Sequence, residues 1–379
     1  MRTKILQFID TNEQDMLALW RKIVLIESPS HYKEGVDKVG ALVADFCKQH
    51  LGYHVRFQKD AVYGNCLAAC SCPFELFHDG IVISAHMDTV HSLGSFDPVL
   101  REDSEYLYGP GAGDCKGGII MALLVAGALK HCGYDNRPIK LIFAADEESG
   151  GPTGKVFYPK ELEGAAYMFN AESGIRNKLV TGRKSSIIAK FHIEGKPAHV
   201  GYLSGTPISA IREATEKLLA LENASDYDTL TFCAGTIHGG TMATSVPGTC
   251  DLEVNVRIKD DKYIEKALSI LQETANHSFV PGTCCALEVF GNAVPMSQRS
   301  ENVNLCCRFS AVSQTLGYNA YESAFVGGAS DASYASQMHI PVVCASGPIV
   351  DFQHTLNERV LKASMAERAK VHACLILEL

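Results

Sequence analysis

The sequence predicts an α/β protein that contains a second, inserted α+β domain. Apolar segments of strand length alternate with segments of helical length in residues 1–182 and again after residue 298, as in a sheet covered by helices. Between residues 183 and 297 the order changes to strand, helix, strand, strand, helix, strand. A chain of 379 residues has room for about two domains. We therefore expect one discontinuous domain, residues 1–182 with 298–379, and one inserted domain, residues 183–297.

The composition excludes several classes of protein. The net charge of −9, with no basic run, argues against nucleic acid or an anionic membrane surface as a partner. No apolar run reaches the roughly 18 residues of a membrane span, and the first residues show no signal-peptide core. The 14 cysteines form no Cys-x-x-Cys pair. We read them as reduced thiols of a cytoplasmic protein, rather than as a secreted disulfide framework or a zinc finger.

Two helices and two strands are predicted ahead of the central strands. The tetrapeptide TNEQ at residues 11–14 has capping-box spacing, and apolar residues follow it at helical period. The tripeptide SPS at residues 28–30 ends this helix, and a second helix covers residues 34–50. Residues 53–57 and 64–70 are read as strands.

Three further predicted strands each end in histidine or carboxylate side chains. These strands and the polar residues after them are residues 81–85 with His86 and Asp88, residues 139–145 with Glu147 and Glu148, and residues 167–171 with Glu172. In open α/β sheets, ligand sites form at the carboxyl ends of the strands. One acidic strand end is a common solvated feature, but three together indicate a site.

His86 and Asp88 have the spacing of a metal ligand and its support. Alternate residues of a strand face the same side, so both side chains point one way. The imidazole would bind the metal while the carboxylate accepts its other ring N–H. The alternative is an ordinary surface or core pair.

A glycine-rich loop, GPGAGDCKGG at residues 109–118, precedes an apolar helix over residues 119–130. It is not a phosphate loop, because it has no Gly-Lys followed by Ser or Thr, as the Walker A motif requires, and no strand directly before it, as the dinucleotide fingerprint requires. The glycines instead give the backbone unusual freedom around Asp114. Asp114 is either the cap of the helix or a site residue.

The inserted domain has the ferredoxin-like order of elements. The predicted strands and helices are residues 186–194 (strand), 206–221 (helix), 230–237 (strand), 249–258 (strand), 261–277 (helix) and 284–290 (strand). Thr206 supplies an N-cap and Pro207 the first helical position.

After residue 300 the first domain resumes. The predicted elements are a helix over 302–316, a glycine-rich turn at 327–331 before a short helix, a strand over 341–345, a loop with His354, and a helix over 362–377.

Histidines and carboxylates collected in this way suit zinc or a similar first-row ion. The candidate site residues are His86, Asp88, Asp114, Glu147, Glu148, Glu172 and His354. Two histidines and three carboxylates are too many for one tetrahedral ion, but they fit two ions, about 3.5–4 Å apart, that share a bridging carboxylate.

The motifs resemble the M20 metallopeptidase family, which includes glutamate carboxypeptidase, acetylornithine deacetylase and succinyl-diaminopimelate desuccinylase. The matching motifs are HMDTV at 86–90, GDCKGG at 113–118, DEE at 146–148, AE at 171–172, GKPAH at 195–199, the turn at 327–331, and His354. The glutamate carboxypeptidase branch is the most similar. The resemblance implies a zinc-exopeptidase-like catalytic domain, with a mixed sheet flanked by helices, and an inserted lid and dimerisation domain.

The resemblance also implies roles for the first-domain residues. Asp114 would bridge two Zn²⁺ ions per chain, for which Co²⁺ or Mn²⁺ could substitute. His86 and Glu172 would complete one metal site, and Glu148 and His354 the other. Asp88 would orient His86, and Glu147 would be the general base that takes a proton from the attacking water. The family also has a cis peptide bond after the bridging aspartate, here Asp114–Cys115.

For the inserted domain, the resemblance implies a homodimer. His199 would reach the partner's active site and stabilise the oxyanion, and Arg257 would hold the substrate carboxylate. Alternatively, His199 lies on the lid surface and Arg257 pairs with a lid glutamate. Gly328 would also contact substrate, and Thr244 stands where many members have asparagine, which leaves the substrate preference open.

The expected function is hydrolysis of an amide bond next to a free carboxylate, in a small peptide or an N-acyl amino acid. The alternatives are a deacylase of acetylornithine or succinyl-diaminopimelate type and a metal-binding dimer without turnover. We expect Asp331, His91 and His238 to have no special role, and Cys115 to point away from the metals.

Overall fold

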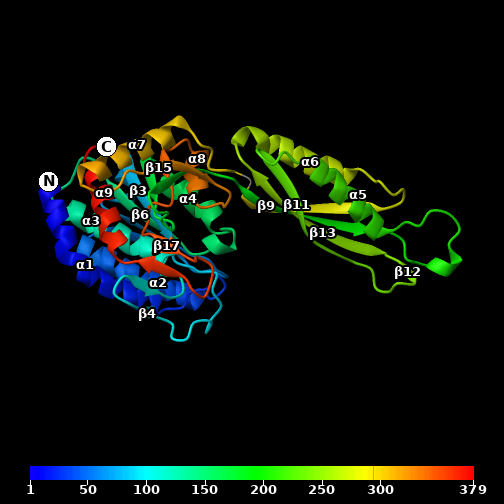
Figure 1. Cartoon of the computed structure of the whole chain (residues 1–379), viewed down its shortest axis with the longest axis horizontal. Helices are drawn as coiled ribbons and strands as arrows, with labels where there is room; N and C mark the ends of the chain where they lie inside the picture. The colour runs from blue at the N-terminus through cyan, green and yellow to red at the C-terminus, as the bar shows by residue number, and fades with distance from the viewer. Residues whose placement is uncertain (293) are drawn as a thin grey trace. The chain divides into compact units, whose positions relative to one another are not determined.

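The chain folds into two units in the computed structural model, which describes residues 1–292 and 294–379 (Figure 1). The first unit comprises Met1–Gly182, Gln298–Phe325 and Ser330–Leu379. The second comprises Arg183–Ser297 and the short segment Val326–Ala329. The second unit is therefore inserted into the first.

A six-stranded mixed sheet forms the centre of the first unit. Its strand order is β1 (His54–Gln58), β2 (Cys66–Cys70), β6 (Ile139–Ala144), β3 (Gly80–His86), β7 (Ala165–Asn170) and β16 (Val342–Val343). β3 is parallel to both β6 and β7, whereas β2 is antiparallel to β6. His86 pairs with Ala144, and Ser84 pairs with Asn170. The three strands that end in site residues are therefore neighbours, and their carboxyl ends are level, which confirms the predicted α/β fold.

Helices cover this sheet. They are α1 (Arg2–Val24), α2 (Lys33–Phe46), α3 (Lys116–His131), α4 (Gly154–Leu162), α7 (Ser300–Thr315), α8 (Ala332–Gln337) and α9 (Ala363–Ile376). α3 is buried over most of its length because nearly all its residues are apolar or small, and it packs between β3, α1 and α9. α2 and α4 contact β2.

The first helix begins earlier than predicted. α1 starts at Arg2, so the proposed capping box at residues 11–14 lies inside it and does not cap it. The buried residues Ile5 and Ile9 extend the helical period backwards, and the Asn12 side chain donates to the carbonyl of Phe8 one turn earlier. The apolar period of the whole segment therefore outweighs one local capping signal.

Two small sheets of the first unit have no counterpart in the sequence prediction. One has the order β17 (Val350–Asp351), β18 (Arg359–Leu361), β5 (Tyr106–Tyr108) and β4 (Arg101–Glu102). The other pairs β8 (Lys178–Arg183) with β15 (Glu322–Val326). The β18–β5 pairing brings the segment with His354 next to the segment that leads into the glycine-rich loop.

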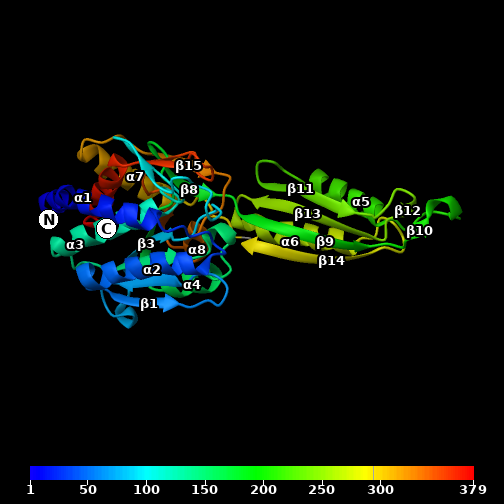
Figure 2. The same cartoon turned by 90° about the horizontal axis from the view of Figure 1, so that it is seen from below.

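The second unit has the predicted ferredoxin-like topology (Figure 2). Its elements are β9 (Ser186–Glu194), α5 (Ala210–Asn223), β11 (Leu230–Gly239), β13 (Thr249–Ile258), α6 (Ile264–Asn276) and β14 (Cys284–Asn292). The strand order is β11-β13-β9-β14, with all neighbours antiparallel. Alternate residues of β9, such as Ile187 and Phe191, form a core with α5 and α6. The N-cap of α5 is Ser209, which accepts from the Arg212 N–H, and not Thr206 as predicted.

Two chain-wide properties complete the description. In residues 1–292 and 294–379, no helix is both long and apolar enough to cross a bilayer. All 14 cysteines of the sequence are free thiols.

Candidate metal site

Five histidine and carboxylate side chains from distant parts of the chain meet at the carboxyl edge of the central sheet. The segments that supply them are the end of β3, the loop before α3, the 3-10 turn Glu147–Ser149 after β6, the residues after β7, and the loop between β17 and β18. Together with Cys115 and Glu147, their ligand atoms fall into three overlapping groups, each within 4.8 Å: His86, Asp114, Cys115 and Glu172; His86, Glu147 and Glu148; Asp114, Glu148 and His354. The predicted convergence of the strand ends is therefore observed.

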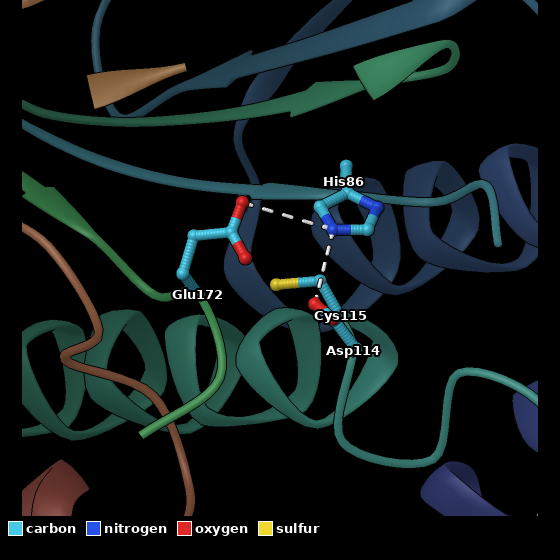
Figure 3. Close-up of side chains that lie close together, drawn as sticks. All are labelled: His86, Asp114, Cys115 and Glu172. Atoms are coloured by element: carbon cyan, nitrogen blue, oxygen red, sulfur yellow. Dashed lines mark ion pairs between the residues drawn. The ribbon is translucent and has the colours of Figure 1, made fainter. Parts of the chain in front are cut away.

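Asp114 lies between the two histidines. Its Oδ1 atom is 3.4 Å from His86 Nε2, and its Oδ2 atom is 3.2 Å from His354 Nε2. Each histidine also lies near a second carboxylate. Glu172 Oε1 is 3.7 Å from His86 Nε2 (Figure 3). Glu148 Oε1 is 3.5 Å from His354 Nε2. One carboxylate near both histidines and two carboxylates that are each near one histidine are a suitable donor set for a pair of cations.

Local backbone structure brings Asp114 to this position. The N-cap of α3 is Cys115, and the Asp114 carboxylate faces the histidines, so the alternative in which Asp114 caps the helix is wrong. The Asp114–Cys115 peptide bond is cis, as the resemblance implies. At Gly118 an added Cβ would lie 2.0 Å from the carbonyl oxygen of Ala171. Glycine is therefore required for α3 to approach the end of β7, next to Glu172.

Cys115 does not turn away from the cluster, contrary to the expectation. Its Sγ atom groups with the ligand atoms of His86, Asp114 and Glu172. The expectation relied on strand-like alternation, but the backbone of Cys115 is not extended, with φ −127° and ψ 23°. Burial raises the pKa of the thiol well above its usual value, and the thiol donates to the Ala171 carbonyl at 3.1 Å. A protonated thiol engaged in this way is a poor metal ligand.

Asp88 supports two site segments at once. The Nδ1 atom of His86 lies 3.0 Å from the Asp88 carbonyl oxygen and 3.3 Å from Oδ1. The same carboxylate accepts the backbone N–H groups of Glu147 at 3.2 Å and Glu148 at 3.1 Å. It also accepts the hydroxyl of Ser30 at 2.6 Å, a residue that sequence reasoning assigned only to a helix end. Asp88 thus fixes both the His86 ring and the turn with the two glutamates.

The electrostatics of the cluster favour a cation. Burial, followed by the charge of Glu172, raises the pKa of Glu147 well above its usual value. Hydrogen bonds to Asp114 and Glu148 raise the pKa of His354 to about 10. Asp114 Oδ1 is buried and accepts no hydrogen bond from the described residues. Its nearest basic neighbour is His86 Nε2 at 3.4 Å, so a metal ion between the two atoms would satisfy a buried oxygen that accepts no hydrogen bond.

The predicted substrate residues His199, Thr244, Arg257 and Gly328 lie in the second unit. His199 is exposed in β10 (Ala198–His199), and its Nδ1 accepts the Gly201 N–H at 3.0 Å. The carbonyl oxygen of Thr244 accepts the Val200 N–H at 3.1 Å. These contacts are local, and the roles of both residues at the metal site stay predictions.

Arg257 and Gly328 also have contacts within the second unit. Arg257 Nε donates to Asn255 Oδ1 at 2.8 Å, and its Nη1 donates to the Gly327 carbonyl at 3.4 Å. Among the described residues, Arg257 therefore contacts an amide and a carbonyl, and no ion pair with a glutamate is found. The Gly328 carbonyl accepts from Arg183 at 3.0 Å.

Of the three residues expected to have no special role, His238 is exposed on β11. Asp331 is buried, and burial raises the pKa of its carboxyl well above the usual value. His91 is buried and contacts Glu358, a residue that the sequence analysis did not single out.

Comparisons with known proteins agree with this architecture. The sequence model of peptidase family M20/M25/M40 matches residues 82–378. Carboxypeptidase G2 of Pseudomonas sp. (strain RS-16) is 25% identical over 390 residues, covering 100% of this chain and 92% of the relative. Succinyl-diaminopimelate desuccinylase of Wolinella succinogenes is 26% identical over 312 residues, covering 77% of this chain and 82% of the relative.

Solved structures share the fold. A tripeptidase from Staphylococcus aureus superposes with a TM-score of 0.78 at 22% identity, covering 96% of this chain and 98% of that one. Aminopeptidase PepT from Bacillus cereus has a TM-score of 0.78 at 20% identity, covering 97% and 98%.

Proposed function

We propose that this chain is a two-zinc hydrolase that cleaves an amide next to a free carboxylate. The chain belongs to peptidase family M20/M25/M40, and it is therefore an enzyme that hydrolyses peptide or amide bonds. The observation that supports this most is the Asp114 carboxylate, whose two oxygens each face one histidine. His86 and Glu172 would hold one ion, Glu148 and His354 the other, and Asp114 both.

The bound ions would supply Lewis acidity to the amide carbonyl and to the attacking water. Glu147 would take the proton from that water on its carboxylate and then deliver it to the leaving amine. Its position favours this task, because the backbone N–H groups of Glu147 and of the neighbouring ligand Glu148 are both held by Asp88. The base and the ligand are therefore fixed on the same short turn.

The substrate would present its carboxylate to Arg257, whose planar guanidinium can bind both oxygens. Gly328 and Thr244 would also contact the substrate, and His199 would donate to the oxyanion. A small peptide or a pteroyl-type glutamate conjugate fits this description. Because Thr244 is shorter than asparagine and has no amide N–H, it would make a different contact with the substrate.

The test is Glu147→Ala, with Glu163→Gln, at an exposed glutamate, as the matched control. We expect Glu147→Ala to lose turnover while zinc content, measured by elemental analysis, stays near two ions per chain. Glu163→Gln should keep both turnover and zinc. Unchanged hydrolysis in Glu147→Ala would refute the assigned base.

A second candidate function is deacylation of an N-acyl amino acid. It is supported by the succinyl-diaminopimelate desuccinylase relative, which is 26% identical over 77% of this chain, against 25% over 100% for the carboxypeptidase relative. Product analysis on dipeptides, a pteroylglutamate, acetylornithine and succinyl-diaminopimelate would separate the two. Release of free glutamate or another C-terminal amino acid supports the peptidase, and release of acetate or succinate supports the deacylase.

We also propose that the enzyme is a cytoplasmic homodimer that associates through the second unit. Free thiols at all 14 cysteines agree with a reducing compartment. The dimer follows from the role proposed for His199, which requires a partner. Light scattering on the purified chain tests it, and a monomer at all concentrations would contradict it.

A further inference from the structure

A buried carboxylate outside the ligand set holds the loop that contains Asp114. Glu358 lies directly before β18 and is 1% exposed. Its Oε1 atom accepts the backbone N–H of Gly113 at 3.0 Å and that of Asp114 at 3.1 Å. Its Oε2 atom accepts from His91 Nε2 at 2.8 Å, and His91 is itself 7% exposed. All three hydrogen bonds end on one carboxylate.

This arrangement fixes the backbone rather than the side chain of Asp114. The N–H groups of Gly113 and Asp114 both point at Glu358 Oε1, which sets the orientation of the two peptide planes. The direction in which the Asp114 side chain leaves the backbone follows from that orientation. The other side of the loop is also confined, because an added Cβ on Gly113 would lie 2.2 Å from the Val350 side chain. The loop is therefore held between Val350 and Glu358.

The segment that provides Glu358 also provides His354. The Glu358 N–H donates to the Thr355 carbonyl at 3.1 Å, which closes a turn just after His354. His354 has φ +63°, a left-handed conformation that non-glycine residues rarely adopt and that surrounding contacts must maintain. One short segment thus supplies a ligand and anchors the neighbouring ligand.

His91 connects the same anchor to the opposite side of the site. It lies three residues after Asp88, which contacts His86. A continuous series of contacts therefore runs from His86 through the segment of Asp88 and His91 to Glu358 and Asp114. Asp114 is the residue that both histidine halves of the site share.

We propose that Glu358, oriented by His91, is a positioning residue that places the Asp114 carboxylate for simultaneous contact with two divalent cations. This inference rests on the proposed metal site, but it does not depend on which amide is cleaved. Neither residue touches the substrate or the cations. Outer contacts of this kind typically change metal affinity by about 10–100-fold.

The experiment measures binding of Co²⁺ to the full chain, first stripped with a chelator and then titrated in competition with a chromophoric chelator. Glu358→Leu keeps the size of the side chain and leaves the two N–H groups without an acceptor. We expect it to weaken Co²⁺ binding by about 10–100-fold and to change the visible absorption of bound Co²⁺. Glu358→Gln, which keeps one acceptor oxygen, should lie between Glu358→Leu and the unaltered chain.

His91 provides a test by conservative replacement. His91→Leu removes the donor and should weaken binding, by less than Glu358→Leu does. His91→Gln can still donate from its amide nitrogen and should restore most of the affinity. If Glu358→Leu fails to fold, the comparison of these two His91 variants still decides the question.

Glu161→Leu is the matched control for a purely structural role. Glu161 is a 2% exposed carboxylate of the same unit that accepts two hydrogen bonds from Arg56, at 2.9 and 2.8 Å. We expect this variant to lower the free energy of unfolding in urea while Co²⁺ affinity and absorption stay unchanged.

Two outcomes overturn the proposal. The first is unaltered Co²⁺ affinity and absorption in folded Glu358→Leu or His91→Leu. The second is an equal loss in Glu161→Leu, which would show that the effect follows stability alone. An unaltered chain that binds two Co²⁺ ions but hydrolyses no amide would instead refute the proposed function and leave this proposal testable.

Discussion

The two halves of the candidate metal site differ in how firmly the protein holds them. His86 ends a central strand, has a 1% exposed side chain and contacts Asp88 through its Nδ1 atom. His354 lies in a loop between two short strands, and its side chain is 50% exposed. Within residues 1–292 and 294–379, no hydrogen bond holds its Nδ1 atom.

This difference indicates that the first half is preorganised and that the second depends on its loop. A ligand already held in its bound orientation loses little conformational freedom when a cation binds. The His86 half should therefore bind its ion more tightly than the His354 half. Asp114 is common to both halves, so its loss should weaken metal binding in both of them.

The largest effect should follow from Asp114→Asn. This change removes the negative charge that both halves share. We expect both ions to be lost on dialysis and kcat/KM to fall by about 10³-fold or more, as for removal of a central electrostatic group. Elemental analysis and hydrolysis rates measure the outcome. Retention of two ions would show that the halves do not depend on a common ligand.

The next effect compares the two histidines directly. His354→Ala should lose the ion of the weaker His354 half and retain the ion of the His86 half. His86→Ala should instead lose the ion of the His86 half, which is the tighter one in the unaltered chain. Co²⁺ titration of both variants gives the affinity that remains in each. Equal losses from both substitutions would contradict the proposed asymmetry.

A smaller effect is expected for Asp88→Asn, because the amide can still accept one of several hydrogen bonds. Metal affinity at the His86 half should fall by about 10–100-fold. Asp351→Asn is the control near the other half, since Asp351 pairs with Arg359 in a partly exposed ion pair at 3.1 Å. Such pairs contribute little, so its Co²⁺ titration should match that of the unaltered chain. A change as large as that of Asp88→Asn would show that the His354 half is also rigidly supported.

The last effect concerns stability rather than metal binding, and it defines the pH range in which the variants can be compared. His372 is fully buried in α9 and stacks edge-on against Phe169 and Phe309, and burial lowers its pKa to about 3. Below about pH 6.5 the unfolded chain protonates this imidazole, while the folded chain does so only near pH 3. The unfolded state then binds more protons, so the free energy of unfolding falls as pH falls, by up to about 1.4 kcal/mol per pH unit.

His372→Leu should flatten this decline in urea unfolding measured between pH 7 and 4. His78→Gln, at an exposed histidine of the same unit, should not change it. An equal slope in His372→Leu and the unaltered chain would show that this imidazole does not limit stability in acid.

Both residues of the firm half, His86 and Glu172, can be predicted from the sequence pattern. They follow apolar strands, as Glu148 of the other half also does, and parallel neighbours bring the carboxyl ends of these strands to one edge. His354 follows a strand of two residues, too short for any periodic signal. Its role as a metal ligand is implied by the resemblance alone.

The contacts that support the ligands could not be predicted from the pattern. Glu358 and Gly113 are 245 residues apart in sequence, and nothing local marks the hydrogen bond between them. The prediction that the Cys115 side chain points away from the metals was wrong because the loop backbone is not extended at Cys115. The capping box at residues 11–14 was wrong because a longer apolar period continued through it.

The central claim is that Asp114 joins two cation sites. Anomalous X-ray scattering from crystals of the zinc-loaded chain, recorded at the zinc edge, tests it most directly. We expect two peaks about 3.5–4 Å apart on either side of the Asp114 carboxylate, one beside His86 and one beside His354. A single peak, or peaks that do not contact Asp114, would contradict the account.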